Sequence, residues 1–204
     1  MRMLVGPLVI LMTVMTIGCH RPTVDELTVY GELGEFSLTD QSGKPITQAD
    51  LQGKVWVAGF IFTNCTGPCP HVTATMARLQ KEMADLPNFR LVTFTVDPER
   101  DNVAQLAQYA KQFSADPARW MFLTGPEDEI QRVLRERFKV HRIATKNPMP
   151  GQEFDHSTKL ILVDAQGQIR GLFDGWAGSY SSEMPDAFEA NLDKLRESIR
   201  SLAQ

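Results

Sequence analysis

The pattern of hydrophobic positions changes once between residues 54 and 85, and the change predicts a strand followed by a helix. The run KVWVAGFIF (54–62) is continuously apolar and rich in β-branched and aromatic residues, which is typical of a strand buried on both faces. After it, apolar side chains recur at helical spacing, at Val72, Met76, Leu79 and Met83. They predict an amphipathic helix over 70–85, with Pro70 in its first turn.

The rest of the chain repeats this alternation of strand and helix patterns. Further strands are predicted at 89–97, 120–125, 158–164 and 169–175, and further helices around 103–110, at 127–138 and at 183–204. The last two strands are joined at Gln166-Gly167, which predicts a hairpin. Residues 139–157 contain two prolines and a glycine, and are expected to form a long loop.

The residues before the first buried strand predict a hairpin and a tether. Phe36 and Leu38 alternate with polar residues, and a turn is expected at Ser42-Gly43. Residues 20–33 are interpreted as a tether, so that one domain covers residues 34–204. The order of elements predicts an α/β, thioredoxin-like fold with an N-terminal hairpin and an inserted strand–helix unit.

The first nineteen residues have the pattern of a secretory leader. Arg2 is followed by an apolar stretch, then by small Gly18 and by Cys19. A cysteine at this boundary resembles the bacterial lipoprotein signal, in which the thiol is lipidated. An uncleaved N-terminal anchor with an incidental cysteine is the alternative. Both interpretations place the domain outside the cytoplasm, on the periplasmic side, tethered to a membrane.

The composition indicates a soluble globular domain behind this leader. The chain has 204 residues, of which 43% are hydrophobic and 23% are charged, and its formal net charge is −4. Such a mild acidic balance gives no reason to expect nucleic acid as a partner. The chemistry is therefore sought among individual side chains.

Two of the three cysteines lie four residues apart, in the segment FTNCTGPCPHV (62–72). In an oxidising compartment, Cys65 and Cys69 would form a redox pair, hold a metal ion, or close a purely structural disulfide. Cys69 lies near the start of the predicted helix, where the helix dipole and free N–H groups favour a thiolate. The cysteines alone do not decide between a metal site and a redox site.

His156, in EFDHSTKLILVD, distinguishes the two hypotheses. It lies just before a strand that ends beside the dithiol in a thioredoxin-like sheet. Thioredoxins have a cis-proline at about this point, whereas this chain has no proline between Pro150 and Pro185. Two thiolates and an imidazole suit copper, and thiolates favour Cu(I). Taken alone, however, a single loop histidine is more often a solvated side chain than a ligand.

The segment VDPERD (96–101) ends a strand beside the predicted dithiol strand. Asp97-Pro98 is a common turn and helix start. Its functional interpretation is that the carboxylate of Asp97 docks a partner or tunes the thiols. His71 and Met149 are weaker candidates, because a helix-surface histidine and a loop methionine usually have structural roles.

Taken together, these motifs resemble the SCO/SenC family of copper proteins over roughly residues 34–200. The resemblance rests on GKVWVAGFIFTNCTGPCP, TVDPERD and DHSTKLILVD. It implies that Cys65, Cys69 and His156 bind a copper ion. It also implies that the protein helps to assemble the binuclear copper centre of cytochrome c oxidase, with the copper-site subunit of the oxidase as partner.

Two functions therefore remain open. The first is a copper metallochaperone, and the second is an enzyme, a membrane-tethered thiol–disulfide oxidoreductase that reduces the cysteines of a copper-site client. A dithiol must be reduced before it holds Cu(I), so a thiol reductant protein is a second expected partner. His156 and the missing proline favour the metallochaperone.

Overall fold

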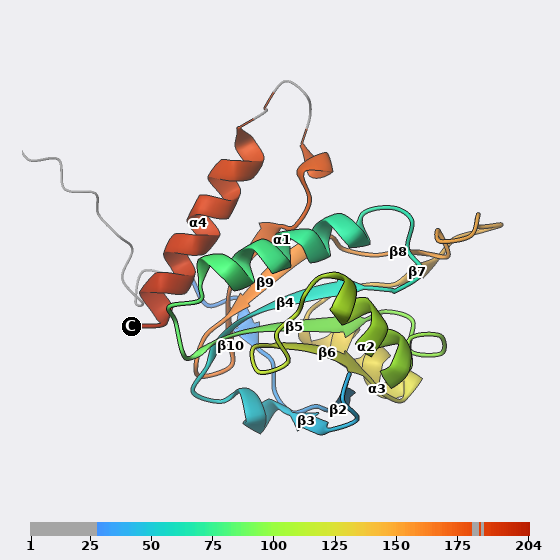
Figure 1. Ribbon diagram of the computed structural model, residues 1–204, viewed down its shortest axis with the longest axis horizontal. Helices are drawn as coiled ribbons and strands as arrows, with labels where there is room; N and C mark the ends of the chain where they lie inside the picture. The colour runs from blue at the N-terminus through green and yellow to red at the C-terminus, as the bar shows by residue number, and fades with distance from the viewer. Residues whose placement is uncertain (1–27, 181–183, 185) are drawn as a thin grey trace, which may run out of the picture.

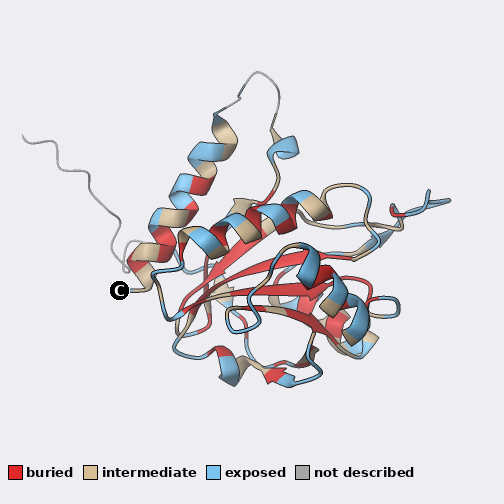
Figure 2. Cartoon of the chain, in the orientation of Figure 1, coloured by how far each residue is buried: buried red, intermediate tan, exposed pale blue. Residues whose placement is uncertain are grey.

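The apolar run at 54–62 forms β4 (Val55–Ile61), and all seven of its residues are buried. The computed structural model describes residues 28–180, 184 and 186–204. Within them β4 pairs in parallel with β5 (Phe89–Thr95) and antiparallel with β9 (Lys159–Val163). Figure 2 shows the buried strands at the centre of the molecule. Burial on both faces explains why the β4 sequence is apolar without alternation.

The sheet extends on both sides of this centre in the order β1-β10-β9-β4-β5-β6-β2-β3. The remaining strands are β1 (Gly31–Glu32), β2 (Ser37–Asp40), β3 (Pro45–Thr47), β6 (Trp120–Thr124) and β10 (Gln168–Asp174). The N-terminal hairpin β2–β3 is confirmed and is followed by a 3₁₀ turn, η2 (Gln48–Leu51). Part of the expected tether differs, because β1 pairs with β10 at the sheet edge.

Helices α1 (Cys69–Glu82), α2 (Val103–Gln112) and α4 (Ala187–Leu202) cover one face of the sheet, with α1 between the other two (Figure 1). Thr73 of α1 shares a hydrogen bond with Tyr109 of α2. On the other side, Arg196 of α4 donates to Glu82 of α1. These contacts hold the three helices together as one layer.

The opposite face is covered by α3 (Glu127–Arg132) and a π-helical turn, η3 (Val133–Arg137). The helix predicted at 127–138 therefore changes its winding halfway. Phe138, at its end, packs its ring 5.1 Å from that of Phe60 and 5.0 Å from that of Phe94. These aromatic contacts form the core beneath β4 and β5.

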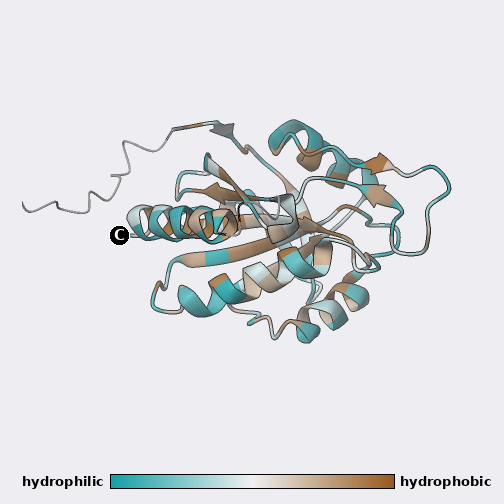
Figure 3. Cartoon of the chain, turned by 90° about the horizontal axis from the view of Figure 1, so that it is seen from above, coloured by the Kyte–Doolittle hydropathy of each residue, from teal (hydrophilic) through white to brown (hydrophobic). Residues whose placement is uncertain are grey.

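The expectation of a plain loop at 139–157 was wrong in one respect. Short strands β7 (Ile143–Ala144) and β8 (Phe154–Asp155) pair antiparallel within it. The resulting hairpin projects from the end of the molecule where α1 begins (Figures 1 and 3). Ile143 near its base is 62% exposed, and Met149 near its tip is 64% exposed.

The predicted leader, including Cys19, lies outside the described residues, as do residues 181–183 and 185. The closing helix, expected from residue 183, is described from Ala187 onward. In the described ranges there is no helix of sufficient length and apolarity to cross a membrane.

Candidate metal site and dithiol

The two cysteines are positioned by the end of β4 and the start of α1. Cys65 lies in the turn between these elements, and Cys69 is the first residue of the helix. Asp101 stabilises this turn through its carboxylate. The Thr63 N–H donates to Asp101 Oδ2 over 3.1 Å, and the hydroxyls of Thr63 and Thr95 also donate to the carboxylate. Asp101 is fully buried, and burial raises the pKa of its carboxyl.

The two thiols are unequal, because one donates to the other. Both are free; Cys65 is half-buried and Cys69 is fully buried. A hydrogen bond from Cys69 lowers the pKa of Cys65 from 9.0 to about 6, and the backbone N–H groups of Cys69 and Gly67 act in the same direction. The pKa of the Cys69 thiol is raised by the same bond and by burial. Cys65 is therefore the thiolate at neutral pH.

This result corrects the expectation that Cys69, at the helix start, is the thiolate. The backbone N–H of Cys69, the first residue of α1, and that of Gly67 in the preceding turn stabilise the thiolate of Cys65 instead. Cys69 lies within the first turn and is shielded from water. It therefore stays protonated and acts as a hydrogen-bond donor. The helix end stabilises a thiolate, as expected, but the thiolate belongs to the preceding turn.

His156 lies beside Cys69, with 3.4 Å between its Nε2 atom and the Cys69 sulfur. Its Nδ1 atom lies 3.0 Å from the Ser157 carbonyl oxygen, a partner that can only accept. Burial lowers the pKa of the imidazole, so the ring is neutral at pH 7. The hydrogen bond assigns the proton to Nδ1, so the Nε2 lone pair and the Cys65 sulfur are two acceptors for the single S–H of Cys69.

Phe62 and Phe154 form an aromatic wall beside His156. The ring of Phe62 meets His156 edge-to-face at 5.9 Å and Phe154 at 5.7 Å. The guanidinium of Arg142 covers the Phe154 ring at 4.6 Å. Cys65 and His156 line a cavity of about 250 Å³ beside this wall. The wall keeps His156 oriented and limits the access of water to Cys69.

The β7–β8 hairpin is joined to the cysteine turn through Gly151. Its carbonyl accepts from the Thr66 N–H at 3.0 Å. Gly151 has φ +83°, and a Cβ there would lie 2.4 Å from Thr66 Cγ2 and 2.6 Å from the Asn64 carbonyl oxygen. Asn64 also donates to Glu153 at 3.3 Å. Only glycine permits so close an approach of the two segments.

Asp97 does not present its carboxylate to a partner, because it is 2% exposed. It forms an ion pair with Arg100, whose guanidinium lies 3.7 Å from Glu153. The charge of Glu153 opposes the lowering of the Cys65 pKa. The expected tuning role therefore has a physical route from Asp97 through Arg100 to Glu153, whereas a direct docking role has none.

The SCO1/SenC family model matches residues 25–184. The chain belongs to the SCO1/SenC family. The SCO1 protein homolog of Bacillus subtilis is 35% identical over 146 residues, which cover 71% of this chain and 74% of that protein. The chain spans only 56% of the mitochondrial protein SCO2 of Saccharomyces cerevisiae, to which it is 30% identical.

Solved structures of this family confirm the thioredoxin-like fold. A structure of BsSco, a Sco-family cytochrome c oxidase assembly protein in which a disulfide switch was identified, aligns with a TM-score of 0.71. It is 29% identical, over 90% of this chain and 99% of that one. Bradyrhizobium japonicum ScoI with copper bound aligns with a TM-score of 0.60 and 29% identity, over 80% of this chain and 98% of that one.

In this SCO1/SenC chain, the three predicted ligands are brought together and the weaker candidates are not. Cys65, Cys69 and His156 form a series of contacts centred on Cys69. His71 is exposed and stacks on Trp176, with ring centroids 5.9 Å apart. Within the described residues, no three His, Cys, Asp or Glu side chains already form a metal-binding group.

Sequence reasoning missed the residues that support the site. Asp101 is not singled out by the sequence patterns, although it closes the motif VDPERD that ends beside the dithiol. Phe62 was counted only as the end of an apolar run. Gly151 was taken as a loop residue. The VDPERD motif was the available signal for Asp101, whereas nothing in the sequence indicated the partners of Phe62 or Gly151.

Proposed function

We propose that this chain is a copper metallochaperone that binds one copper ion through Cys65, Cys69 and His156. The observation that carries the proposal is the neutral imidazole whose unprotonated Nε2 atom lies 3.4 Å from the Cys69 sulfur, beside the second thiol of Cys65. A ligating histidine commonly donates its other ring N–H to a backbone carbonyl, as His156 does to Ser157.

The donor set suits copper. Soft thiolates select Cu(I), and imidazole is also a common copper ligand. Cys65 already favours the thiolate form, whereas Cys69 would release its proton when copper binds. Small side-chain movements around Cys69 would complete the site, since both other ligands already contact it. Copper is the cargo in this function, and the half-exposed Cys65 is the ligand that a recipient would reach first.

The recipient in this proposal is the copper-site subunit of cytochrome c oxidase, at its binuclear copper centre. A similar protein with copper bound and the oxidase-assembly role of BsSco support this choice. The leader would hold the domain at a membrane on the periplasmic side, with Cys19 as the lipidated residue. A thiol reductant protein would return a Cys65–Cys69 disulfide to the copper-binding state.

Copper titration of the reduced protein tests the metal site. The wild type is expected to bind one equivalent, and Cys65→Ser/Cys69→Ser to bind none at that site. His156→Ala should bind more weakly, and Cu(II) more so than Cu(I), because two thiolates remain. His71→Ala is the matched control, since His71 lies two residues from Cys69 but contacts Trp176. Unchanged stoichiometry in the double cysteine variant would reject the proposal.

A thiol–disulfide oxidoreductase is the second candidate function, and it would make the chain an enzyme. The pairing of a low-pKa thiolate at Cys65 with a buried, protonated Cys69 favours it. The first would attack the disulfide of a copper-site client, and the second would resolve the mixed disulfide. Under this function His156 has no direct role in the chemistry.

A further inference from the structure

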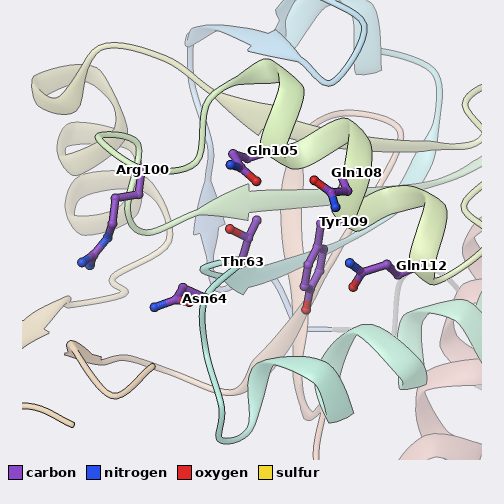
Figure 4. A pocket seen from close by; sticks show the side chains of 7 residues that line it. All are labelled: Thr63, Asn64, Arg100, Gln105, Gln108, Tyr109 and Gln112. Atoms are coloured by element: carbon purple, nitrogen blue, oxygen red, sulfur yellow. The ribbon is translucent and has the colours of Figure 1, made fainter. Parts of the chain in front are cut away.

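A polar cavity of about 500 Å³ lies between the cysteine turn and α2 (Figure 4). Its lining residues are Thr63, Asn64, Arg100, Gln105, Gln108, Tyr109 and Gln112. Asn64 immediately precedes Cys65, so the wall of this cavity begins about 3.8 Å along the chain from the thiolate residue. Cys65 and His156, two of the three proposed copper ligands, line a separate cavity next to the β7–β8 hairpin. The proposed copper site does not use the cavity.

Helix α2 presents a row of glutamines to this cavity. Gln105, Gln108 and Gln112 follow one another at intervals of three and four residues, which places them on one side of a helix (Figure 4). All three are exposed, and their side-chain amides make no hydrogen bond to the described part of the chain. At 1.5 Å per residue the row is about 10.5 Å long, which matches about three residues of an extended chain.

The floor of the cavity is connected to the second cysteine. Tyr109 is 5% exposed, and its hydroxyl lies 3.0 Å from the Thr73 hydroxyl. Thr73 in turn donates to the Cys69 carbonyl at 2.9 Å. A ligand in the cavity would therefore contact Tyr109, which is hydrogen-bonded to the first turn of α1, the turn that carries Cys69. The cavity is therefore placed to contact a partner molecule that approaches the dithiol.

The cavity offers amide groups rather than charge. Arg100 is its one charged lining residue, and its guanidinium is already paired with Asp97 and faces Glu153 at 3.7 Å. The carboxylate of Asp101 lies buried beneath Thr63. A glutamine or asparagine amide both donates and accepts hydrogen bonds, and so does each residue of a peptide main chain. A main chain is thus the group that fits this lining.

We infer that the cavity binds an extended peptide segment of about three residues through its main-chain amides. The segment is part of the partner protein that contacts Cys65. This assignment of the partner rests on the proposed function, whereas the peptide site itself does not. Gln105, Gln108 and Gln112 supply hydrogen bonds from α2, and Asn64 supplies them from the cysteine turn. The cavity thereby positions a partner's chain next to the thiolate without recognising a particular side chain.

Capture of activated peptides by the reduced protein tests this inference. The probe is a heptapeptide with three alanines on each side of a cysteine that carries thionitrobenzoate in a disulfide. Attack by the Cys65 thiolate breaks that disulfide, forms a peptide–Cys65 disulfide and releases coloured thionitrobenzoate; Cys69 then displaces the peptide thiol and closes the protein disulfide. A second heptapeptide is identical except that its alanine amides are N-methylated and cannot donate.

The wild type is expected to capture the plain peptide at least three-fold faster than the N-methylated one. In Gln105→Ala/Gln108→Ala/Gln112→Ala this ratio should fall to about one. These positions are exposed and alanine favours helices, so the variant should fold. Gln52→Ala, at an exposed glutamine in the turn that follows η2, is the matched control and should keep the wild-type ratio.

Equal rates for the two peptides in the wild type would overturn the inference, as would an unchanged ratio in the triple variant. Copper titration separates this failure from failure of the proposed function. A wild type that binds copper but shows no peptide preference removes the peptide site alone. A wild type that prefers the plain peptide but binds no copper keeps the peptide site and removes the metallochaperone.

Discussion

The sulfur of Cys69 and the Nε2 atom of His156 stand 3.4 Å apart, although 87 residues separate them in the chain. The sheet produces this approach, because β9 runs antiparallel to β4 and returns His156 to the edge where β4 ends. The bond from Nδ1 to the Ser157 carbonyl then fixes the ring. A metal ion that reaches Cys69 would meet an imidazole that is already oriented.

The inequality of the two thiols predicts a distinct pH profile for alkylation. Thiolates react and thiols do not, so the rate of Cys65 modification by iodoacetamide should rise with a midpoint near pH 6, the pKa of about 6 at Cys65. Cys69 should stay unmodified in the folded protein, because it is buried and protonated. Peptide mapping by mass spectrometry at each pH measures both rates.

Cys69→Ala is the matched variant for this profile. It removes the hydrogen bond that lowers the Cys65 pKa, so the midpoint should move up toward the ordinary thiol value of 9.0. A wild-type midpoint near that ordinary value, or modification of Cys69 before Cys65, would contradict the assignment of the thiolate.

Asp101 is expected to support the cysteine turn energetically. Asp101→Ala leaves the Thr63 N–H and two threonine hydroxyls without their acceptor, which should lower the free energy of unfolding by about 2–3 kcal/mol. Asp101→Asn retains an acceptor and should lose less. Urea unfolding of the three proteins at neutral pH measures the difference. Equal losses for alanine and asparagine would show that the hydrogen bonds are not the cause.

The same carboxyl should make stability depend on pH. Burial raises the pKa of Asp101 in the folded state, so the folded protein holds this proton more tightly than the unfolded chain does. The associated stability is fully present below the ordinary aspartate pKa of about 3.9 and is lost as the pH rises through the raised value. As the pH rises from about 3.9 through the raised pKa of Asp101, the free energy of unfolding of the wild type should therefore fall relative to that of Asp101→Asn.

Much of the fold and the identity of the site could be predicted from the sequence. The apolar run of β4 and the helical spacing after it are strong local patterns, and they place Cys65 and Cys69 between a strand and a helix. His156 precedes β9, and the strand order of a thioredoxin-like sheet brings it to the same edge. Its metal-binding role stays a prediction.

Other features depend on contacts that no local pattern encodes. The position of the thiolate is set by which thiol is buried and which receives the hydrogen bond, and both depend on the completed fold. The β7–β8 hairpin has strands of two residues, too short for a visible alternation. The contact of Gly151 with Thr66 joins segments 85 residues apart in the chain.

Gly151→Ala tests whether that contact holds the hairpin in place. A positive φ alone costs a side chain about 1–2 kcal/mol, and the approach of Gly151 to Asn64 and Thr66 adds a steric cost. Gly43→Ala is the matched control, since Gly43 has φ +86° but nothing within 4 Å of its Cβ position. Gly151→Ala should therefore destabilise the protein more than Gly43→Ala does, by about 1–3 kcal/mol.

Thermal or urea unfolding measures both glycine variants. The Gly151 variant should also bind copper more weakly, because the displaced hairpin carries His156 at its end, whereas the Gly43 variant should bind as the wild type does. Similar stabilities and copper affinities for the two variants would show that the hairpin does not need this close approach.

His156→Ala separates the two candidate functions. The variant keeps both thiols and the amides of Gly67 and Cys69 that stabilise the Cys65 thiolate, so disulfide chemistry should persist. The copper site, by contrast, loses one of three ligands. If the chain is a metallochaperone, His156→Ala should abolish support of cytochrome c oxidase assembly in cells that depend on it, while the purified variant still reduces a test disulfide at about the wild-type rate. The readouts are oxidase activity and disulfide reduction, with His71→Ala as the control that should retain both. Full oxidase activity in cells with the His156 variant would instead mean that the imidazole is a bystander, and the thiol–disulfide oxidoreductase would become the function that this site performs.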